Sequence, residues 1–594
     1  MKNVPHNEEA VGTRGEGNSI PEFPQANIAA VRAIADVLAS TFGPLSNDKM
    51  IVNALASEGE TDETAPAQLP TDDIVLANDS GTLLRELPIE HPIAPIILRL
   101  IGPERPGDTE IEGRDIYDGI SETVILTASL LDTAEKLLEK GLHPYDVRTG
   151  YFVAHKNALN ALSELAHPLD SFVVPRTAAV ATARTAMTGN DVAGYADTWA
   201  SLAVDAVDQV GMPDEETFVV RQISRGAIAD SRLVYGAVLD VNHRVSDEMP
   251  KRVDDANVLV LDGHEAGGLM DPNIDWHEDT TINLSSPDQV NDMEQVYSDR
   301  RERLVDHYTS LGVDVIVTRL GINNEFQHLL ADRGILGIRS VNRLDLQQLA
   351  LATDASHVMN PDDVDASDLG YAGIVEEVMR EPRRHRQQNR FMTIFDDCDG
   401  ARSVVMMLHG VTDQIADQAT TEVRKAAKAV ATARGEAGQR PDVVPGAGAT
   451  ELELAAAVRE TATTHDSRAQ LAIEAFADAL EEVVATLIAN AGADRVETLA
   501  DLIAAHARGG PNDGYILPHG EIEDAFEANV LDPAAYKCQT LSAATEVADL
   551  ILKIDDTIDA VFTEEPAGPD DSIYPEQAED HQEYLERNQG TRWD

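Results

Sequence analysis

The stretch GRDIYDGISETVILTASLL, residues 113–131, has the residue types and spacing of an anion site. Asp118 and Gly119 predict a turn, and apolar residues at near-helical spacing follow it from Val124 onward. A helix that begins at a glycine turn presents unpaired backbone N–H groups and the positive end of its dipole, which attract phosphate. Asp118 would repel a bare phosphate, but its carboxylate suits a phosphate that carries Mg²⁺. The alternative is that Asp118 or Ser121 only caps the helix.

Other elements must position further polar residues beside this helix. Residues 77–92, ANDSGTLLRELPIEHP, predict a second helix that begins at an aspartate turn, and residues 41–50, TFGPLSNDKM, predict a turn at Gly43–Pro44. Short strands are expected at 51–52 and at 74–76. The sequence has no GxxxxGK[ST] loop, which disfavours an unrelated ATP-dependent ligase or kinase.

The charge of the chain is extreme. Among 594 residues, 105 are acidic and 46 are basic, which gives a formal net charge of -59. Such a chain is not expected to bind nucleic acid or an anionic membrane, because no long basic patch interrupts the acidic residues. Molar salt would screen the self-repulsion, so we interpret the composition as adaptation to a salty cytoplasm. An ordinary acidic mesophilic protein is the alternative.

Cysteine content and hydropathy indicate a soluble intracellular protein. Cys398 and Cys538 are too few for a disulfide framework, no CxxC pair could hold zinc, and both residues are expected to be small and buried. Neither a signal peptide nor a run of about 20 apolar residues is present, so a cytoplasmic location is expected.

The chain has mainly helical ends and a middle in which strands and helices alternate. Residues 1–22 and 563–594 are polar and are predicted to be disordered. Two acidic insertions, 57–73 and 106–114, are predicted to be loops. The arrangement predicts nested domains, in which the chain leaves one domain and later returns to it.

Seven or more motifs follow one another in the order of a known family. TFGPLSNDKM is similar to T-L-G-P-K-G-M-D-K-M, ANDSGTLL to T-N-D-G-A-T-I-L, YDGISETVIL to G-D-G-T-T-T-A-V-V-L, and VVPGAGATELELA to V-V-P-G-G-G-A-x-E-x-E-L-A. The family with these motifs is the group II chaperonins, which are the archaeal thermosome and its eukaryotic cytosolic relatives. The resemblance extends from about residue 23 to about residue 562.

The resemblance implies a chaperonin fold of three α and α/β domains. It implies ATP and Mg²⁺ as cofactors, unfolded or partly folded proteins as clients, and a double ring of identical or related subunits. The equatorial domain would be mainly helical and would comprise residues 23–166 and 415–562, the second part beginning with a hinge helix. A small α/β intermediate domain would comprise residues 167–222 and 378–414. An inserted α/β apical domain would comprise residues 223–377 and would carry a helical protrusion at about 243–300.

The resemblance also implies a set of nucleotide-binding residues. Asp118 would bind Mg²⁺, Asp532 would lie near the sugar and base, and Asp79 is the candidate catalytic residue. The residues that match the family's nucleotide site are Gly43, Pro44, Asp48, Asn78, Asp79, Gly81, Asp118, Gly119, Ser121, Gly446, Gly448 and Asp532.

Three of the departures from the family pattern bear most directly on phosphate binding and hydrolysis. Ile120 removes a hydroxyl donor, and Glu122 is expected to add negative charge near the phosphates. Lys425 stands where the family's hinge has an aspartate that activates the attacking water, and loss of such a base costs about 10²- to 10⁴-fold in rate. The alternatives are that Asp413 or Asp417 replaces this base, or that Lys425 reaches the γ-phosphate and holds ATP without turnover.

Two functions follow from these features. The first is a chaperonin subunit that binds ATP and unfolded protein and assists folding, with weakened or lost ATP hydrolysis. The second is a non-catalytic chaperonin-like scaffold or holdase with no nucleotide cycle.

Overall fold

The structure is a computed structural model of the 594-residue chain. It describes residues 22–45, 47, 49–52, 74–77, 79–87, 89, 91–98, 119–187, 195–223, 226–239, 248–262, 287–319, 321–379, 391–411, 416–436, 438–465 and 467–554. The two polar ends and both acidic insertions therefore lie outside the described residues, apart from Glu22, with which the first helix begins.

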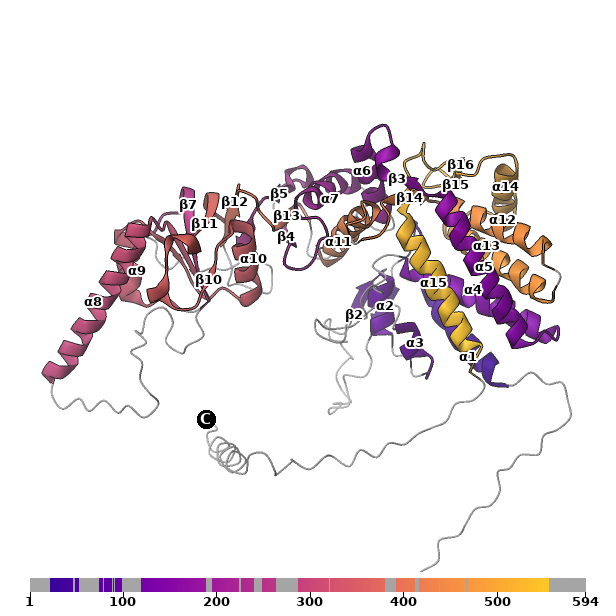
Figure 1. Ribbon diagram of the computed structural model, residues 1–594, viewed down its shortest axis with the longest axis horizontal. Helices are drawn as coiled ribbons and strands as arrows, with labels where there is room; N and C mark the ends of the chain where they lie inside the picture. The colour runs from indigo at the N-terminus through magenta and orange to yellow at the C-terminus, as the bar shows by residue number, and fades with distance from the viewer. Residues whose placement is uncertain are drawn as a thin grey trace, which may run out of the picture. The chain divides into compact units, whose positions relative to one another are not determined.

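Helices from both ends of the chain pack into one unit (Figure 1). The central helix is α4, which contacts helices from the N-terminal and the C-terminal parts of the sequence. Fourteen of its 20 residues are buried, because apolar and small residues occupy almost all of its first three turns. The helices of this unit are α1 (Glu22–Ala39), α2 (Ser80–Glu86), α3 (Ala94–Leu98), α4 (Ile120–Glu139), α5 (Pro144–Leu165), α12 (Ala449–Thr463), α13 (Ala469–Asn490), α14 (Arg495–Ala507) and α15 (Ala534–Ile551).

Short strands accompany these helices. β1 (Lys49–Val52) and β2 (Ile74–Ala77) pair antiparallel, which confirms the two predicted strands. β14 (Asp442–Pro445) pairs with β17 (Leu531–Pro533) and with β3 (His167–Pro168). β15 (Asp513–Ile516) and β16 (Glu521–Asp524) form a hairpin.

A three-stranded sheet lies in the middle of the sequence, in the order β4–β13–β5. Its strands are β4 (Phe218–Ile223), β5 (Arg232–Val234) and β13 (Val404–His409). Three helices share a hydrophobic core with it around the fully buried Trp199. They are α6 (Pro175–Ala186), α7 (Ala196–Val210) and α11 (Ala416–Ala433).

A second, seven-stranded sheet has the order β6–β12–β11–β7–β8–β9, and β10 pairs with the end of β7. β7, β8 and β9 are parallel, whereas β11 pairs antiparallel with both β7 and β12. The strands are β6 (Ala237–Leu239), β7 (Arg252–Leu261), β8 (Val315–Thr318), β9 (Leu336–Ile338), β10 (His357–Val358), β11 (Gly370–Met379) and β12 (Phe391–Asp396). The helices associated with this sheet are α8 (Pro287–Leu311), α9 (Asn324–Asp332) and α10 (Arg343–Thr353).

Four segments lie elsewhere than the sequence division puts them. β5 pairs with β13, although it falls within the predicted apical range, 223–377. α11 shares the core around Trp199, although it falls within the predicted equatorial range, 415–562. The other two segments belong to the seven-stranded sheet. β7 belongs to the centre of the seven-stranded sheet, although its residues fall within the range predicted as a protrusion, 243–300. β12 pairs with β11 in the same sheet, although it falls within the predicted return segment, 378–414. The local residue pattern does not show which strands pair, because pairing joins residues that are distant in sequence.

The prediction of two buried cysteines is half wrong. Cys398 is buried and Cys538 is exposed, since Cys538 lies off the buried face of α15. Among the residues that the structure describes, no helix is both long and apolar enough to cross a membrane.

Candidate functional site

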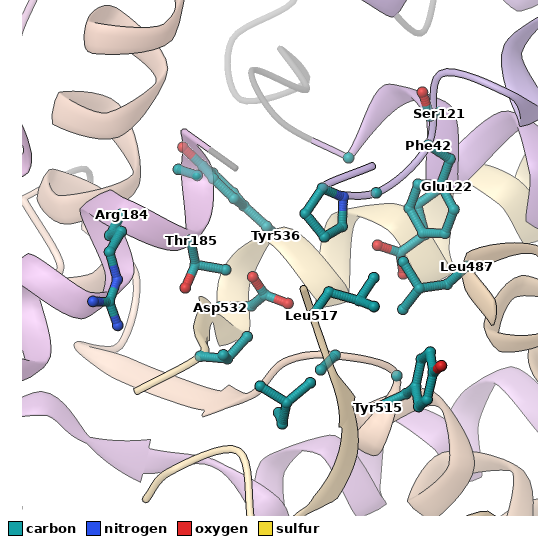
Figure 2. Close-up of a pocket in the computed structure, with 18 of the residues that line it drawn as sticks. Phe42, Ser121, Glu122, Arg184, Thr185, Leu487, Tyr515, Leu517, Asp532 and Tyr536 are labelled. Atoms are coloured by element: carbon teal, nitrogen blue, oxygen red, sulfur yellow. The ribbon is translucent and has the colours of Figure 1, made fainter. Parts of the chain in front are cut away.

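A cavity of about 740 Å³ opens among residues from both ends of the chain. Its walls include the loop at 41–44, the N-termini of α2, α4 and α12, the middle of α11, and residues 528–540. Figure 2 shows part of this lining, with Glu122 drawn near Phe42 and Asp532 near Thr185. The predicted site residues that line the cavity are Gly43, Pro44, Asp79, Gly119, Ser121, Lys425, Gly448 and Asp532.

Five predicted site residues are not part of this lining as described. Gly81 is buried within α2. Gly446 is close to two lining residues, because a Cβ there would meet Val530 Cγ1 at 2.9 Å and Asp532 Oδ2 at 3.3 Å. Asp48, Asn78 and Asp118 fall outside the described residues. The predicted Mg²⁺ ligand, Asp118, therefore stays a prediction, and no metal-binding group of three or more acidic, histidine or cysteine side chains occurs in the described part of the chain.

Two helices begin at the cavity with glycine. Gly119 is the N-cap of α4 with φ 87°, and Gly448 is the N-cap of α12 with φ 84°. Both values lie in the left-handed region that glycine adopts without strain. Neither helix has a side-chain cap, so Ser121 is not the cap of α4. Its hydroxyl instead contacts the hydroxyl of Ser80. The first N–H groups of both helices are consequently suited to an anion.

Asp79 forms one wall of the cavity with residues of α11. It is the N-cap of α2, and its Oδ2 accepts hydrogen bonds from the backbone N and the Oγ1 of Thr82 at 2.8 and 3.0 Å. Its Oδ1 lies 2.6 Å from Lys425 Nζ, which is also 3.2 Å from Glu422 Oε1. Burial alone would raise the pKa of Asp79, but Lys425 and the Thr82 hydrogen bonds outweigh it, so the pKa is lowered. Asp79 is therefore ionised at neutral pH.

A second buried lysine gathers three carboxylates. Lys537 Nζ lies 2.8 Å from Glu122 Oε2, 2.7 Å from Glu451 Oε1 and 3.4 Å from Asp532 Oδ2. The side chains of Lys537, Glu122 and Glu451 are 12%, 10% and 5% exposed. One ammonium cannot neutralise three carboxylates, two of which are buried, so protonation of one of them is favoured.

The proton belongs mainly to Glu122. Burial and the neighbouring Glu451 and Asp532 raise the pKa of Glu122 to about 8, although Lys537 opposes the shift. In contrast, Lys537 lowers the pKa of Glu451 against the effect of burial. The raised pKa favours the neutral form of Glu122 at pH 7, so Glu122 adds less negative charge beside the phosphates than the sequence predicts.

Lys537, Glu451 and Glu422 were not predicted as site residues from the sequence. One signal was present, since each glycine turn is followed three residues later by a glutamate, Glu122 after Gly119 and Glu451 after Gly448. No comparable pattern identifies the lysine, because it is more than 80 residues away along the chain from either glutamate and reaches them only through the fold.

The described residues fit a nucleotide in several respects. Two helix N-termini without a side-chain cap open into the cavity, and Asp532, the middle residue of β17, lies on its wall. The neutral state of Glu122 removes one source of repulsion from a phosphate at α4. Position 425 of α11 is a lysine, so it offers no carboxylate that could act as the catalytic base. Of the alternatives for a base, Asp413 lies outside the described residues, and Asp417 is placed only as a residue of α11.

Comparison with known proteins identifies the family. The model of the TCP-1/cpn60 chaperonin family matches residues 34–561, nearly the whole chain. The chain belongs to this chaperonin family. It is 34% identical to the thermosome subunit beta of Desulfurococcus mucosus over 540 residues, which cover 89% of this chain and 98% of the relative. It is 33% identical to a thermosome subunit of Methanopyrus kandleri, with 90% and 91% covered, and to the thermosome subunit alpha of Halobacterium salinarum, with 90% and 88% covered.

These relatives are thermosome subunits, so the resemblance to the group II chaperonins is confirmed. The combination of a helical unit and two sheets agrees with the chaperonin fold class.

Proposed function

We propose that this chaperonin subunit binds a nucleotide with Mg²⁺ in the cavity and hydrolyses ATP slowly or not at all. The single observation that supports this proposal is the Lys425–Asp79 ion pair of 2.6 Å, which lies on the cavity wall beside two helix N-termini. The helix N-termini favour phosphate binding. The ion pair puts a cation where the resemblance expects the catalytic base.

The chaperonin relatives support the wider role. We propose that the protein binds unfolded or partly folded proteins in the cytoplasm and assembles with itself or related subunits into a double ring. The helical unit would be the equatorial domain, and the sheet β4–β13–β5 with α6, α7 and α11 would be the intermediate domain. The seven-stranded sheet, including β12, would be the apical domain.

The nucleotide would be held by this chain's own residues in distinct ways. Backbone N–H groups in the first turns of α4 and α12 would bind phosphate oxygens, and Asp532 would accept hydrogen bonds from the sugar. Bound Mg²⁺ would neutralise phosphate charge. Lys425 cannot accept a proton from water while it is protonated, so it cannot act as the general base.

A scaffold or holdase with no nucleotide cycle is the second candidate. The observation in its favour is that Lys425 and Asp79 already form an ion pair with each other. The two candidates differ in whether the cavity binds nucleotide at all.

The test is to measure ATP hydrolysis and the binding of a labelled ATP analogue by the full-length protein in molar KCl with Mg²⁺. We expect binding with little turnover, and a Lys425→Asp variant is expected to gain turnover by about 10²-fold. Lys428→Asp is the matched control, because Lys428 lies one turn further along α11 and is not among the residues that line the cavity. Rapid turnover by the unmodified protein would contradict the proposal, and absence of nucleotide binding would favour the scaffold.

A further inference from the structure

The ion pair between Asp79 and Lys425 lies directly beside the N-terminus of α4. Ser80, the next residue after Asp79, contacts the hydroxyl of Ser121 in the first turn of α4. A chain of phosphates bound at this N-terminus and extending toward α2 therefore meets Asp79 and Lys425. A ligand that extends toward the Lys537 cluster meets Asp532 instead.

Asp79 is a fixed negative charge at this position. Both of its carboxylate oxygens are engaged, Oδ2 by the backbone N and hydroxyl of Thr82 and Oδ1 by Lys425. The side chain is 22% exposed, so solvent screens it only in part. The lowered pKa of Asp79 means that it does not become neutral near pH 7 to admit a further anion.

Lys425 is not available as an independent cation. Its ammonium contacts Asp79 and also Glu422, whose side chain is only 4% exposed. Lys537, the other lysine in the described part of the lining, is engaged with three carboxylates. A phosphate at this wall therefore meets a cation that already has two carboxylate partners.

The opposing charges of the pair are close enough to cancel for an approaching anion. Oδ1 of Asp79 and Nζ of Lys425 are 2.6 Å apart, so a phosphate near one is near the other. Its attraction to the ammonium is opposed by its repulsion from the carboxylate of Asp79, and Glu422, whose Oε1 lies 3.2 Å from Nζ, adds a second repulsion. A phosphate could gain Lys425 outright only by separating it from Asp79, which would leave a partly buried carboxylate without its counter-ion.

We propose that the cavity recognises the nucleoside diphosphate part of its ligand and gains no affinity from a third phosphate, because the Asp79–Lys425 ion pair cancels the attraction. This inference rests on the proposed nucleotide binding and names the ligand class of the same cavity. Asp79 and Lys425 are then specificity-determining residues, and the site does not distinguish the nucleotide before hydrolysis from the nucleotide after it.

The experiment compares ADP with the non-hydrolysable β,γ-imido analogue of ATP by isothermal titration calorimetry. The full-length protein is used in molar KCl, with and without Mg²⁺. The unmodified protein is expected to bind the two ligands with dissociation constants within about threefold of each other. Asp79→Asn removes the negative charge but keeps an N-cap residue, and it is expected to shift the ratio of the two constants toward the analogue by tenfold or more.

Lys425→Met gives an independent result. With the ammonium removed and Asp79 still charged, the ratio is expected to shift toward ADP by tenfold or more. Lys428→Met is the control on the same helix, and far-ultraviolet circular dichroism shows whether each variant is folded.

The outcomes separate this inference from the proposal on which it rests. If the unmodified protein binds the analogue at least tenfold more tightly than ADP, the inference is wrong and the proposed nucleotide binding stands. If Asp79→Asn and Lys425→Met both leave the ratio unchanged, the ion pair does not set specificity and the inference is again wrong. If neither ligand binds, the proposed function fails and the inference fails with it.

Discussion

Replacing Glu122 by glutamine tests whether this buried side chain carries a proton at neutral pH. Glu122 contacts Lys537 at 2.8 Å and shares that ammonium with Glu451 and Asp532. Glutamine has nearly the same shape, and its amide oxygen can accept the hydrogen bond from Lys537. The substitution therefore removes the titration of this group while keeping the packing.

The structure gives the sign and the size of the effect. The pKa of Glu122 is about 8 in the folded protein, whereas that of an unfolded glutamate is near 4.5. Between these values the folded state binds one proton more than the unfolded state, so the free energy of unfolding falls as pH rises. One proton corresponds to about 1.4 kcal/mol per pH unit. Across the interval the cost to the unmodified protein is on the order of 4 kcal/mol.

Glu122→Gln lacks this dependence. The unmodified protein and the variant are expected to be similarly stable near pH 5, and the variant is expected to be more stable by several kcal/mol near pH 8. The measurement is urea unfolding between pH 5 and pH 8.5. Unfolding is monitored by pulsed hydrogen exchange of peptides from α4. Peptide resolution is needed because a chain with several units does not unfold in one two-state step.

The matched control is Glu497→Gln. Glu497 also lies in the first turn of a helix, α14, but it is exposed. Its substitution is expected to leave the pH dependence of the α4 peptides unchanged. If the curves of the unmodified protein and Glu122→Gln stay parallel from pH 5 to pH 8, the neutral state that we infer for Glu122 is refuted.

Two other predictions concern the same cavity. Lys537→Met is expected to destabilise the helical unit by about 3–5 kcal/mol, because it leaves Glu451 buried without its counter-ion. If urea unfolding shows a decrease of less than about 1 kcal/mol in the free energy of unfolding, the buried ion pair does not stabilise the unit as expected. Gly448→Ala is expected to cost more than the roughly 1–2 kcal/mol of a left-handed non-glycine residue, because its Cβ would meet Val484 at 2.8 Å. Gly141→Ala isolates the backbone cost, since Gly141 has φ 86° and open space around it; equal losses in the two variants would show that Val484 gives way.

The sequence was sufficient for features that depend on neighbouring residues. The turn at Gly119 and the helix after it were predictable because a glycine followed by apolar residues at helical spacing fixes both locally. The strands β1 and β2 were predictable for a similar reason. The order of motifs was sufficient to assign the family, and the presence of Lys425 in place of an aspartate is visible in the sequence alone.

Strand pairing was less predictable than strand position. β12 pairs with β11, although the residue pattern of the sequence gave no indication of this pairing. β7 lies in the middle of a sheet rather than in a protrusion. Pairing depends on hydrogen bonds between strands, and the residues of one strand do not specify their partner.

The charges in the cavity were decided by the tertiary structure. The sequence determined that Glu122, Lys425 and Lys537 are present, but their protonation and their partners depend on burial and on distances across the fold. Lys537 approaches Glu122 from α15, and Lys425 approaches Asp79 from α11. Electrostatic energy in a partly buried site depends on the separation of the charges and on their exposure to water. Only the folded arrangement therefore favours the neutral form of Glu122 and pairs Lys425 with Asp79.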